Sequence, residues 1–163
     1  MDRGALDAAI ARSFPCGGWC PEGRRAEDGV IAERYPVTEL PGAGYRQRTK
    51  RNVIDSDGTL VIFFGETKGG TRETLRFCEQ LGKPALTVNA IETSAELAAS
   101  KAVEFISRNT IGVLNVAGPR ESNHPGAREY AERTVGRILD ALEEGRKQGV
   151  GRAERGAGKS VIK

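Results

Sequence analysis

The sequence predicts an α/β fold in which helices cover both faces of a mainly parallel sheet. Three apolar runs of strand type, "TLVIFF", "PALTV" and "IGVLNVAG", alternate along the chain with segments of helical periodicity. Runs that are apolar throughout suit strands buried on both faces. Strands that alternate with helices are typical of a parallel sheet between two helical layers. We therefore expect a three-layer sandwich.

The helices and the remaining segments follow from apolar periodicity, capping residues and turn residues. Residues 15–29 are so rich in glycine and proline that no regular element is expected there. The segment "PALTV", by contrast, is expected to be a buried strand. The expected elements are a helix over residues 2–13, a short strand in "YPVTEL", a polar helix in "GYRQRTKRNVIDSD", a helix from Thr71 to Gly82 with Leu75, Cys78 and Leu81 inward, a helix that a capping box opens at Thr93, and a long helix with Pro125 in its first turn.

Length and composition allow one domain. The chain has 163 residues, of which 38% are hydrophobic. The last segment, "GVGRAERGAGKSVIK", is basic and rich in glycine, so we divide the chain into a single domain, residues 1–148, and a disordered tail, residues 149–163. No apolar run approaches the ~18–20 residues that cross a bilayer, and the first residues do not resemble a signal peptide. We expect a cytoplasmic protein with no membrane partner.

Charge and cysteine content exclude two other classes. The net charge is +3, and residues 146–163 carry +5, which leaves the rest of the chain at −2 and so close to neutral. A near-neutral domain is unlike a nucleic-acid binder, whose affinity depends on clustered phosphate contacts. Three cysteines and one histidine are too few and too scattered to predict a zinc site, so we expect no directly ligated metal.

The loop after "TLVIFF" is the first candidate site. Ligands in parallel sheets bind beyond the carboxyl ends of the strands. Gly69 and Gly70 have no Cβ atom, so their backbone amides can approach an anion closely. Thr71 can donate its hydroxyl group, and the helix that follows contributes unpaired N–H groups and a favourable dipole. A plain left-handed turn would use the same residues, but the position between a buried strand and a helix favours anion binding.

The loop after "IGVLNVAG" is the second candidate site. Gly118 and Pro119 shape the turn, and Arg120 and Ser122 could meet a charged ligand. The alternative is an ordinary helix entry in which Arg120 is only solvated. For His124, which precedes the next helix, a structural position at the helix start is the favoured interpretation.

The segment "DSDGTL" has the spelling of an aspartate-nucleophile phosphatase motif, with Asp55 as nucleophile and Asp57 as acid and base. That chemistry needs both carboxylates at the exposed end of a buried strand. Here the apolar strand follows the two aspartates instead of preceding them. We therefore reject the phosphatase and expect the end of a polar helix, with one of the two aspartates facing the ligand.

Taken together, seven segments resemble the putative molybdenum carrier protein family, a group of small Rossmann-like proteins related to the phosphoribohydrolases once described as lysine decarboxylases. They lie in order from Asp2 to about Leu139: "DRGALDAAI", "GGWCPEGRRAEDG", "YPVTEL", "RTKRNVIDSDGTLVI", "GGTRET", "GKP" and "LNVAGPRES". Family members open with a strand and a Gly-Gly-Gln-Thr-Gly turn ahead of Asp-Arg. Here Met1 directly precedes Asp2, so we expect the sheet to lack this N-terminal strand and to expose an edge.

The resemblance implies binding of a phosphate-bearing ligand, either a pterin such as the molybdenum cofactor or a nucleotide-like molecule. The positions that match the family's binding segments are Gly69, Gly70 and Thr71 in the phosphate turn, Gly118, Pro119 and Arg120 in the second loop, and Arg48, Asn52 and Asp55 on the polar helix. A pterin cofactor would be held through its phosphate and ring hydrogen bonds. A homo-oligomer is left open.

Three functions remain as alternatives at this point. The related phosphoribohydrolases have a catalytic glutamate three residues after the threonine of the phosphate turn, and this chain has Thr74 there. Glu73 is adjacent but points elsewhere, because one residue turns a helix by about 100°. A carrier that does not transform its ligand is therefore favoured over a hydrolase. The third alternative is an interaction domain that keeps only the fold.

Overall fold

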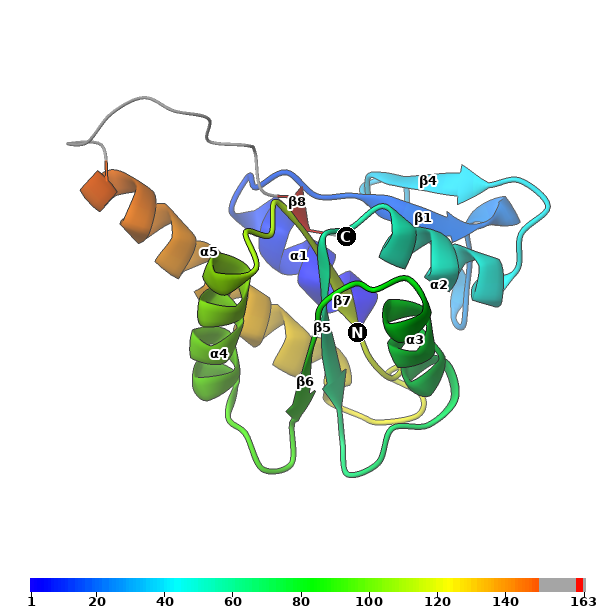
Figure 1. Ribbon diagram of the computed structural model, residues 1–163. Coiled ribbons are helices and arrows are strands. Elements are labelled where there is room, and N and C mark those ends of the chain that lie inside the picture. The colour runs from blue at the N-terminus through cyan, green and yellow to red at the C-terminus, as the bar shows by residue number, and fades with distance from the viewer. Residues whose placement is uncertain (150–160, 163) are drawn as a thin grey trace.

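The computed structural model describes residues 1–149 and 161–162 (Figure 1). In chain order its elements are α1 (Asp2–Ala11), β1 (Gly18–Pro21), the 3-10 helix η1 (Glu22–Arg24), β2 (Arg25–Ala26), β3 (Gly29–Val30), β4 (Val37–Leu40), α2 (Tyr45–Ile54), β5 (Gly58–Phe63), α3 (Gly69–Gln80), β6 (Ala85–Asn89), α4 (Ala95–Arg108), β7 (Val113–Ala117), α5 (Ala127–Gly149) and β8 (Val161–Ile162). From α2 to α5, helices and strands alternate as the sequence predicts.

The main sheet has the strand order β6-β5-β7-β8, and every pairing in it is parallel. The "TLVIFF" run supplies the central strand β5, in which all residues from Gly58 to Ile62 are buried. This confirms the expected α/β class with a parallel sheet. Because the strands run the same way, the carboxyl ends of β5 and β7 meet at one edge of the sheet.

Helices cover the two faces of the sheet in separate layers. On one side α1 and α4 pack against α5 (Figure 1), and the main hydrophobic core joins these helices to alternate strand residues such as Leu60, Ile62 and Val116. On the other side α3 lies against β5, and α2 packs against α3 through a small cluster of Val53, Phe77 and Cys78. The three-layer arrangement that the sequence predicts is therefore present.

The outer edge of β7 is partly covered. Ile162 in β8 pairs with Leu114 and is buried, so part of the edge that we expected to be exposed has a partner strand. Within the described residues α1 is the first element. Most of the predicted tail, residues 150–160 and 163, lies outside the described residues.

The segment from residue 15 to residue 40 was predicted to lack regular structure up to "YPVTEL", and that prediction was wrong. β1 pairs in parallel with β4, and β2 pairs with β3 as a short antiparallel hairpin. The Arg24 guanidinium holds this region together by donating hydrogen bonds to the backbone carbonyl groups of Ile31, Ala32, Tyr35 and Val37. A half-buried arginine thus stabilises strands whose sequence lacks the apolar alternation from which strands are usually predicted.

Like α5, which is described below, α3 and α4 begin at residues other than those predicted. The third helix starts at Gly69, so Thr71 is a buried residue of its first turn and not its cap. The fourth helix is capped by Ser94, whose hydroxyl group accepts a hydrogen bond from the backbone N–H of Leu97, and not by Thr93. Both errors are shifts of one or two positions, since several residues in each segment have capping side chains or a turn conformation.

Three positions predicted to be buried are exposed. Leu81, expected to face inward from α3, is 37% exposed because α3 ends at Gln80, and Phe77 takes the buried place instead. In β6, expected to be buried throughout, Ala85 and Thr87 are exposed. β6 is an edge strand, so it has a neighbouring strand on one side only.

Candidate functional site

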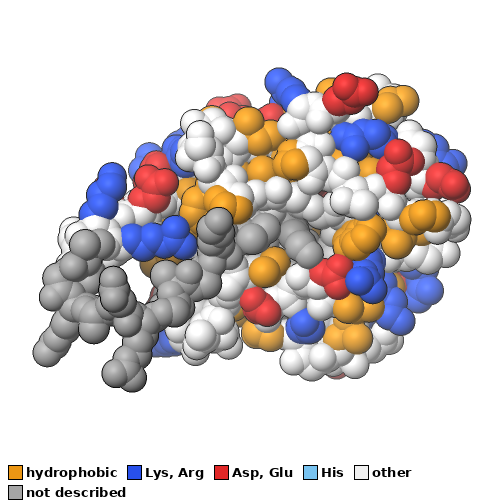
Figure 2. Space-filling model, turned by 90° about the horizontal axis from the view of Figure 1, so that it is seen from above, with side chains coloured by type: hydrophobic (Ala, Val, Ile, Leu, Met, Phe, Trp, Pro, Cys, Tyr) orange, Lys and Arg blue, Asp and Glu red, His pale blue; other side chains and the backbone are white. Residues whose placement is uncertain are grey.

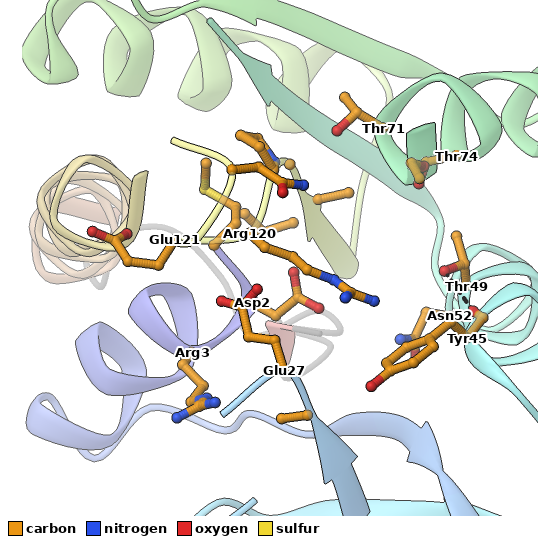
Figure 3. Close-up of a pocket in the computed structure, with 18 of the residues that line it drawn as sticks. Asp2, Arg3, Glu27, Tyr45, Thr49, Asn52, Thr71, Thr74, Arg120 and Glu121 are labelled. Atoms are coloured by element: carbon orange, nitrogen blue, oxygen red, sulfur yellow. Dashed lines mark hydrogen bonds between the residues drawn. The ribbon is translucent and has the colours of Figure 1, made fainter. Parts of the chain in front are cut away.

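A cavity of about 1030 Å³ opens at the carboxyl ends of β5 and β7, where binding sites of parallel sheets are found (Figure 3). Its walls come from α1, the β1–β3 segment, α2, the start of α3 and the loop between β7 and α5. It is lined by every predicted site residue except Asp55, namely Arg48, Asn52, Gly69, Gly70, Thr71, Gly118, Pro119 and Arg120.

The start of α3 presents unpaired donors to this cavity. The first amides of an α-helix, here those of Gly69 and Gly70, have no partner within the helix. A Cβ atom built on either glycine would meet nothing within 4 Å, so the turn faces open space. Gly69 has a φ of +50°, a left-handed conformation that favours glycine. The turn therefore has both the unpaired backbone N–H groups and the open space that an anion needs to bind.

The hydroxyl group of Thr71 adds a side-chain donor to the same turn. Thr71 is only 6% exposed, and Figure 3 shows its oxygen directed into the cavity. Among the described residues this oxygen has no hydrogen-bond partner. Thr74, one helical turn further on, differs because its hydroxyl group already donates to the carbonyl oxygen of Gly70 at 2.9 Å. Thr74 also stands where the related hydrolases have their glutamate, so the structure offers no carboxylate at that position.

Arg120 extends from the second loop across the cavity. Its guanidinium carbon lies 4.4 Å from the centroid of the Tyr45 ring on α2, and Figure 3 shows this side chain pointing from the loop toward Tyr45. Such a cation–π contact is weak enough to rearrange when an anion offers a better partner. Gly118 and Pro119 line the cavity at the base of this loop.

The β2–β3 hairpin closes another side of the cavity through two polar contacts. Glu27 accepts hydrogen bonds from the hydroxyl group of Ser122 at 2.5 Å and from its amide at 3.5 Å. Asp28 forms an ion pair with Arg3 of α1. Ser122, considered as a ligand contact from the sequence, is thus used to hold the hairpin.

Of the three predicted residues of α2, Arg48 and Asn52 line the cavity and Asp55 does not. Arg48 donates from Nη1 to the Asp2 carboxylate at 2.8 Å. Asn52 bonds the backbone of Trp19 in β1, accepting from its N–H at 2.8 Å and donating to its carbonyl oxygen at 3.3 Å. Asp55 accepts from the Trp19 indole at 2.6 Å and from Arg51 at 3.0 Å. Asn52 and Asp55 therefore fasten α2 to β1.

Asp2 is charged at neutral pH. Burial raises the pKa of its carboxyl group, but nearby positive charge, chiefly that of Arg48, and the Arg48 hydrogen bond outweigh burial, so the pKa lies below its ordinary value. The Asp2 side chain is 48% exposed and that of Arg48 is 22% exposed. The pair is consequently both ionised and accessible from the cavity.

Pro125 lies before α5 and not in its first turn. We predicted this proline in the first helical turn, but α5 begins at Ala127. Glu121 supplies the cap, since its carboxylate accepts hydrogen bonds from the amides of Gly126 at 2.6 Å and Arg128 at 2.7 Å. These backbone bonds lower the pKa of Glu121. Although Glu121 lines the cavity, its oxygens are occupied by the helix.

Asp57 of the rejected phosphatase motif and His124 both have structural roles. Asp57 lies at the amino end of β5 and accepts hydrogen bonds from the amides of Gly112 and Val113, opposite to the cavity edge. The His124 ring stacks on Phe64 with centroids 3.7 Å apart, at the start of the α5 segment. Both residues have packing or backbone partners that account for their presence.

The cysteines and acidic residues do not gather into a metal centre in the part of the chain that the structure describes. The three thiols are free, and burial raises the pKa of each, which keeps them protonated at neutral pH. In the same residues, no helix is long and apolar enough to span a membrane.

Sequence reasoning missed many residues of the cavity wall, among them three that reach into the cavity. Asp2, Glu27 and Tyr45 all point into the cavity in Figure 3, from α1, the hairpin and α2 respectively. Asp2 resembles an ordinary acidic residue in the first turn of a helix, and Glu27 lies in a segment for which no element was expected. Only the closeness of these segments in the fold reveals their common site.

The fold defines a class, the Rossmann-like α/β proteins, and in this chain a cavity lies at the carboxyl edge of the parallel sheet, beside the N-terminus of α3. Within it, the chain belongs to the circularly permutated YpsA SLOG family, whose model matches residues 1–139. It is also similar to the crystal structure of a protein from Syntrophus aciditrophicus named "Putative molybdenum carrier protein". The two are 42% identical with a TM-score of 0.82, over 85% of this chain and 87% of that one.

These comparisons confirm the family resemblance seen in the sequence, and the fold class with it. A comparison with curated proteins finds no match.

Proposed function

We propose that this protein binds a phosphate-bearing small molecule, either a pterin such as the molybdenum cofactor or a nucleotide-like molecule, and carries it unchanged. The name of the similar protein from Syntrophus aciditrophicus supports the carrier role. On the face shown in Figure 2, the described Lys and Arg side chains are interspersed with Asp and Glu, which favours a small ligand over a nucleic acid.

The observation that carries this proposal is the set of unused donors at the start of α3. The amides of Gly69 and Gly70 and the hydroxyl group of Thr71 converge on open space in a cavity. The Thr71 hydroxyl group is the side-chain donor of this set, on a residue that is only 6% exposed. A phosphate oxygen placed there accepts from all three donors and gains the helix dipole as well.

The cavity also fits the remainder of such a ligand. Its volume of about 1030 Å³ lies at the upper end of the range typical of ligand pockets, roughly 300–1,000 Å³. Its polar groups suit a phosphate and a heterocyclic ring. Because the described residues form no cluster of metal ligands, a molybdenum cofactor would be held by its organic part.

Carriage is favoured over hydrolysis by the side chain at position 74. A phosphoribohydrolase requires a carboxylate beside the scissile bond, and Thr74 instead bonds the carbonyl oxygen of Gly70. We expect no free base when the protein is incubated with nucleoside monophosphates and the products are separated by chromatography. Steady release of free base would show that the protein is a hydrolase and would contradict the carrier role.

Two threonines of α3 provide a matched test of the phosphate site. Thr71→Val removes the free hydroxyl group, whereas Thr74→Val removes one that is already bonded within the helix. With guanosine 5′-monophosphate (GMP) as probe, calorimetry should show about tenfold weaker binding for Thr71→Val, as expected for a lost hydrogen bond to a charged group. Thr74→Val should bind as the wild type does. Equal affinities of all three proteins would contradict a phosphate at this turn.

A further inference from the structure

The Asp2–Arg48 pair presents a donor and acceptors side by side in the cavity. Asp2 begins α1 and Arg48 lies in α2, so two elements far apart in the sequence supply the pair. Only one hydrogen bond joins them, from Nη1 of Arg48 to Oδ2 of Asp2, at 2.8 Å. Both residues line the cavity, and Figure 3 shows Asp2 near its centre.

Both members of the pair keep capacity for further hydrogen bonds. A guanidinium group has five N–H donors, and among the described residues only Asp2 accepts from that of Arg48. Its Nε is buried without a partner. The ionised carboxylate of Asp2 has about four acceptor positions, of which Arg48 uses one. An incompletely satisfied pair in a cavity calls for a missing partner.

The order of these groups matches one heterocyclic edge. Arg48 has donors to spare and Asp2 has two acceptor oxygens, so the pair can offer a ligand one donor followed by two acceptors. Guanine and 2-amino-4-oxopterin present the complementary order: a carbonyl oxygen, a ring N–H and an exocyclic amino group. A sugar diol would use the carboxylate but would leave the arginine donors unpaired, so the ring edge satisfies more of the pair.

We infer that Asp2 and Arg48 bind the lactam and amino edge of a 2-amino-4-oxo heterocycle, the ring shared by guanine and pterins. The inference rests on the proposed function, because the phosphate of the same ligand lies at the start of α3. In Figure 3 Thr71 and Asp2 lie on different walls of the cavity, which leaves room between them for a ligand joined to both. The pair thereby selects which phosphate-bearing molecule is carried.

Three nucleotides that differ only in the base test the ring edge. GMP has the full edge, IMP lacks the amino group, and AMP has a donor where guanine has its carbonyl oxygen. Calorimetry should rank them GMP, IMP, AMP, with steps of about tenfold, as for the loss of a hydrogen bond to a charged group. Neopterin monophosphate should bind at least as tightly as IMP, and its affinity relative to GMP shows which source of the ring is preferred.

The Asp2→Asn variant should reverse the preference of the site. An asparagine replaces one acceptor oxygen by an amino donor, so the order becomes donor, acceptor, donor. Xanthine presents the complement, and we expect XMP to bind this variant about tenfold more tightly than GMP. A side chain with a merely structural role would weaken both ligands together and would not reverse their order.

Another ion pair that lines the cavity supplies the control. Asp28 pairs with Arg3 on the β2–β3 hairpin, and Asp28→Asn should leave the ranking of GMP above XMP unchanged. If GMP, IMP and AMP bind wild-type protein equally, or if Asp2→Asn keeps the preference for GMP, the ring assignment is wrong although the phosphate site stands. If none of the phosphate-bearing probes binds, the proposed function fails as well.

Discussion

A Cβ atom built on Gly118 would stand 2.6 Å from the carbonyl oxygen of Ile62, whereas one built on Gly70 meets nothing within 4 Å. Both glycines were candidates for the site because both follow a strand. Gly118 is required by the close approach of two backbones, while Gly70 leaves space that packing does not use. At the scale of single residues, this difference separates a structural glycine from one that a ligand can explain.

Alanine substitutions should therefore affect stability and binding in opposite ways. Gly118→Ala forces backbone to shift and should lower the free energy of unfolding by about 1–3 kcal/mol, the usual cost of overpacking. Gly70→Ala should leave stability within about 0.5 kcal/mol of the wild type, as for substitutions in open space, but should weaken GMP binding because the methyl group occupies the anion's place. Urea unfolding and calorimetry measure the two effects. A stable Gly118→Ala protein would show that the close approach is tolerated.

The residues that sequence reasoning found are those with a local signal. Paired glycines and a threonine between a strand and a helix indicate an anion site wherever they occur, and Gly69 and Thr71 do line the cavity. Asp2 and Glu27 have no such signal, since each is one acidic residue among many until the fold brings them together. Asp55 has a different place, because its carboxylate at the end of the expected helix bonds Trp19 and Arg51 and does not line the cavity.

At the scale of elements, α1 and α5 are joined by a paired charge as well as by apolar packing. Arg12 donates two hydrogen bonds to Asp140, at 2.7 and 3.0 Å. The hydrogen bonds from Arg12 lower the pKa of Asp140 below its ordinary value. A lowered pKa in the folded state means that the pair stabilises the fold above the unfolded pKa, about 3.9 for Asp, and that this stability is lost as the pH falls through the folded value.

Asp140→Asn should accordingly destabilise the protein only when the carboxyl group is charged. The Asp140 side chain is 53% exposed, so solvent screens the pair and the expected loss at pH 7 is about 1 kcal/mol or less. Urea unfolding of the variant and the wild type should converge as the pH is lowered below 4, within the range where both remain folded. A difference that stays constant over this range would mean that the contact acts through shape and not through charge.

The elements themselves differ in how far the sequence predicts them. β5 and α5 have long apolar patterns, and both lie within a few residues of the predicted bounds. β1 and β2 were missed because polar side chains, those of Arg24 and Asn52, stabilise this region through hydrogen bonds to its backbone. Such side chains produce no apolar alternation from which a strand could be predicted. β6 was predicted as a strand but not as an edge, because strand order depends on pairings between distant segments.

At the scale of the whole molecule, the cavity exists only because five separate parts of the chain converge. α1, the β2–β3 hairpin, α2, the start of α3 and the loop before α5 each contribute a wall, and the ion pairs Asp2–Arg48 and Arg3–Asp28 join three of them. A ligand that bridges these walls binds the folded state alone and should raise its stability. Thermal unfolding should therefore shift upward with added GMP and much less with guanosine, which lacks the phosphate.

The central claim is that the phosphate of the ligand lies on the first amides of α3. A crystal structure of the protein with GMP tests it most directly. The account predicts phosphate oxygens within hydrogen-bond distance of the Gly69 and Gly70 amides and of the Thr71 hydroxyl group. A well-ordered GMP whose phosphate lies elsewhere in the cavity, with those three donors still unpaired, would contradict it.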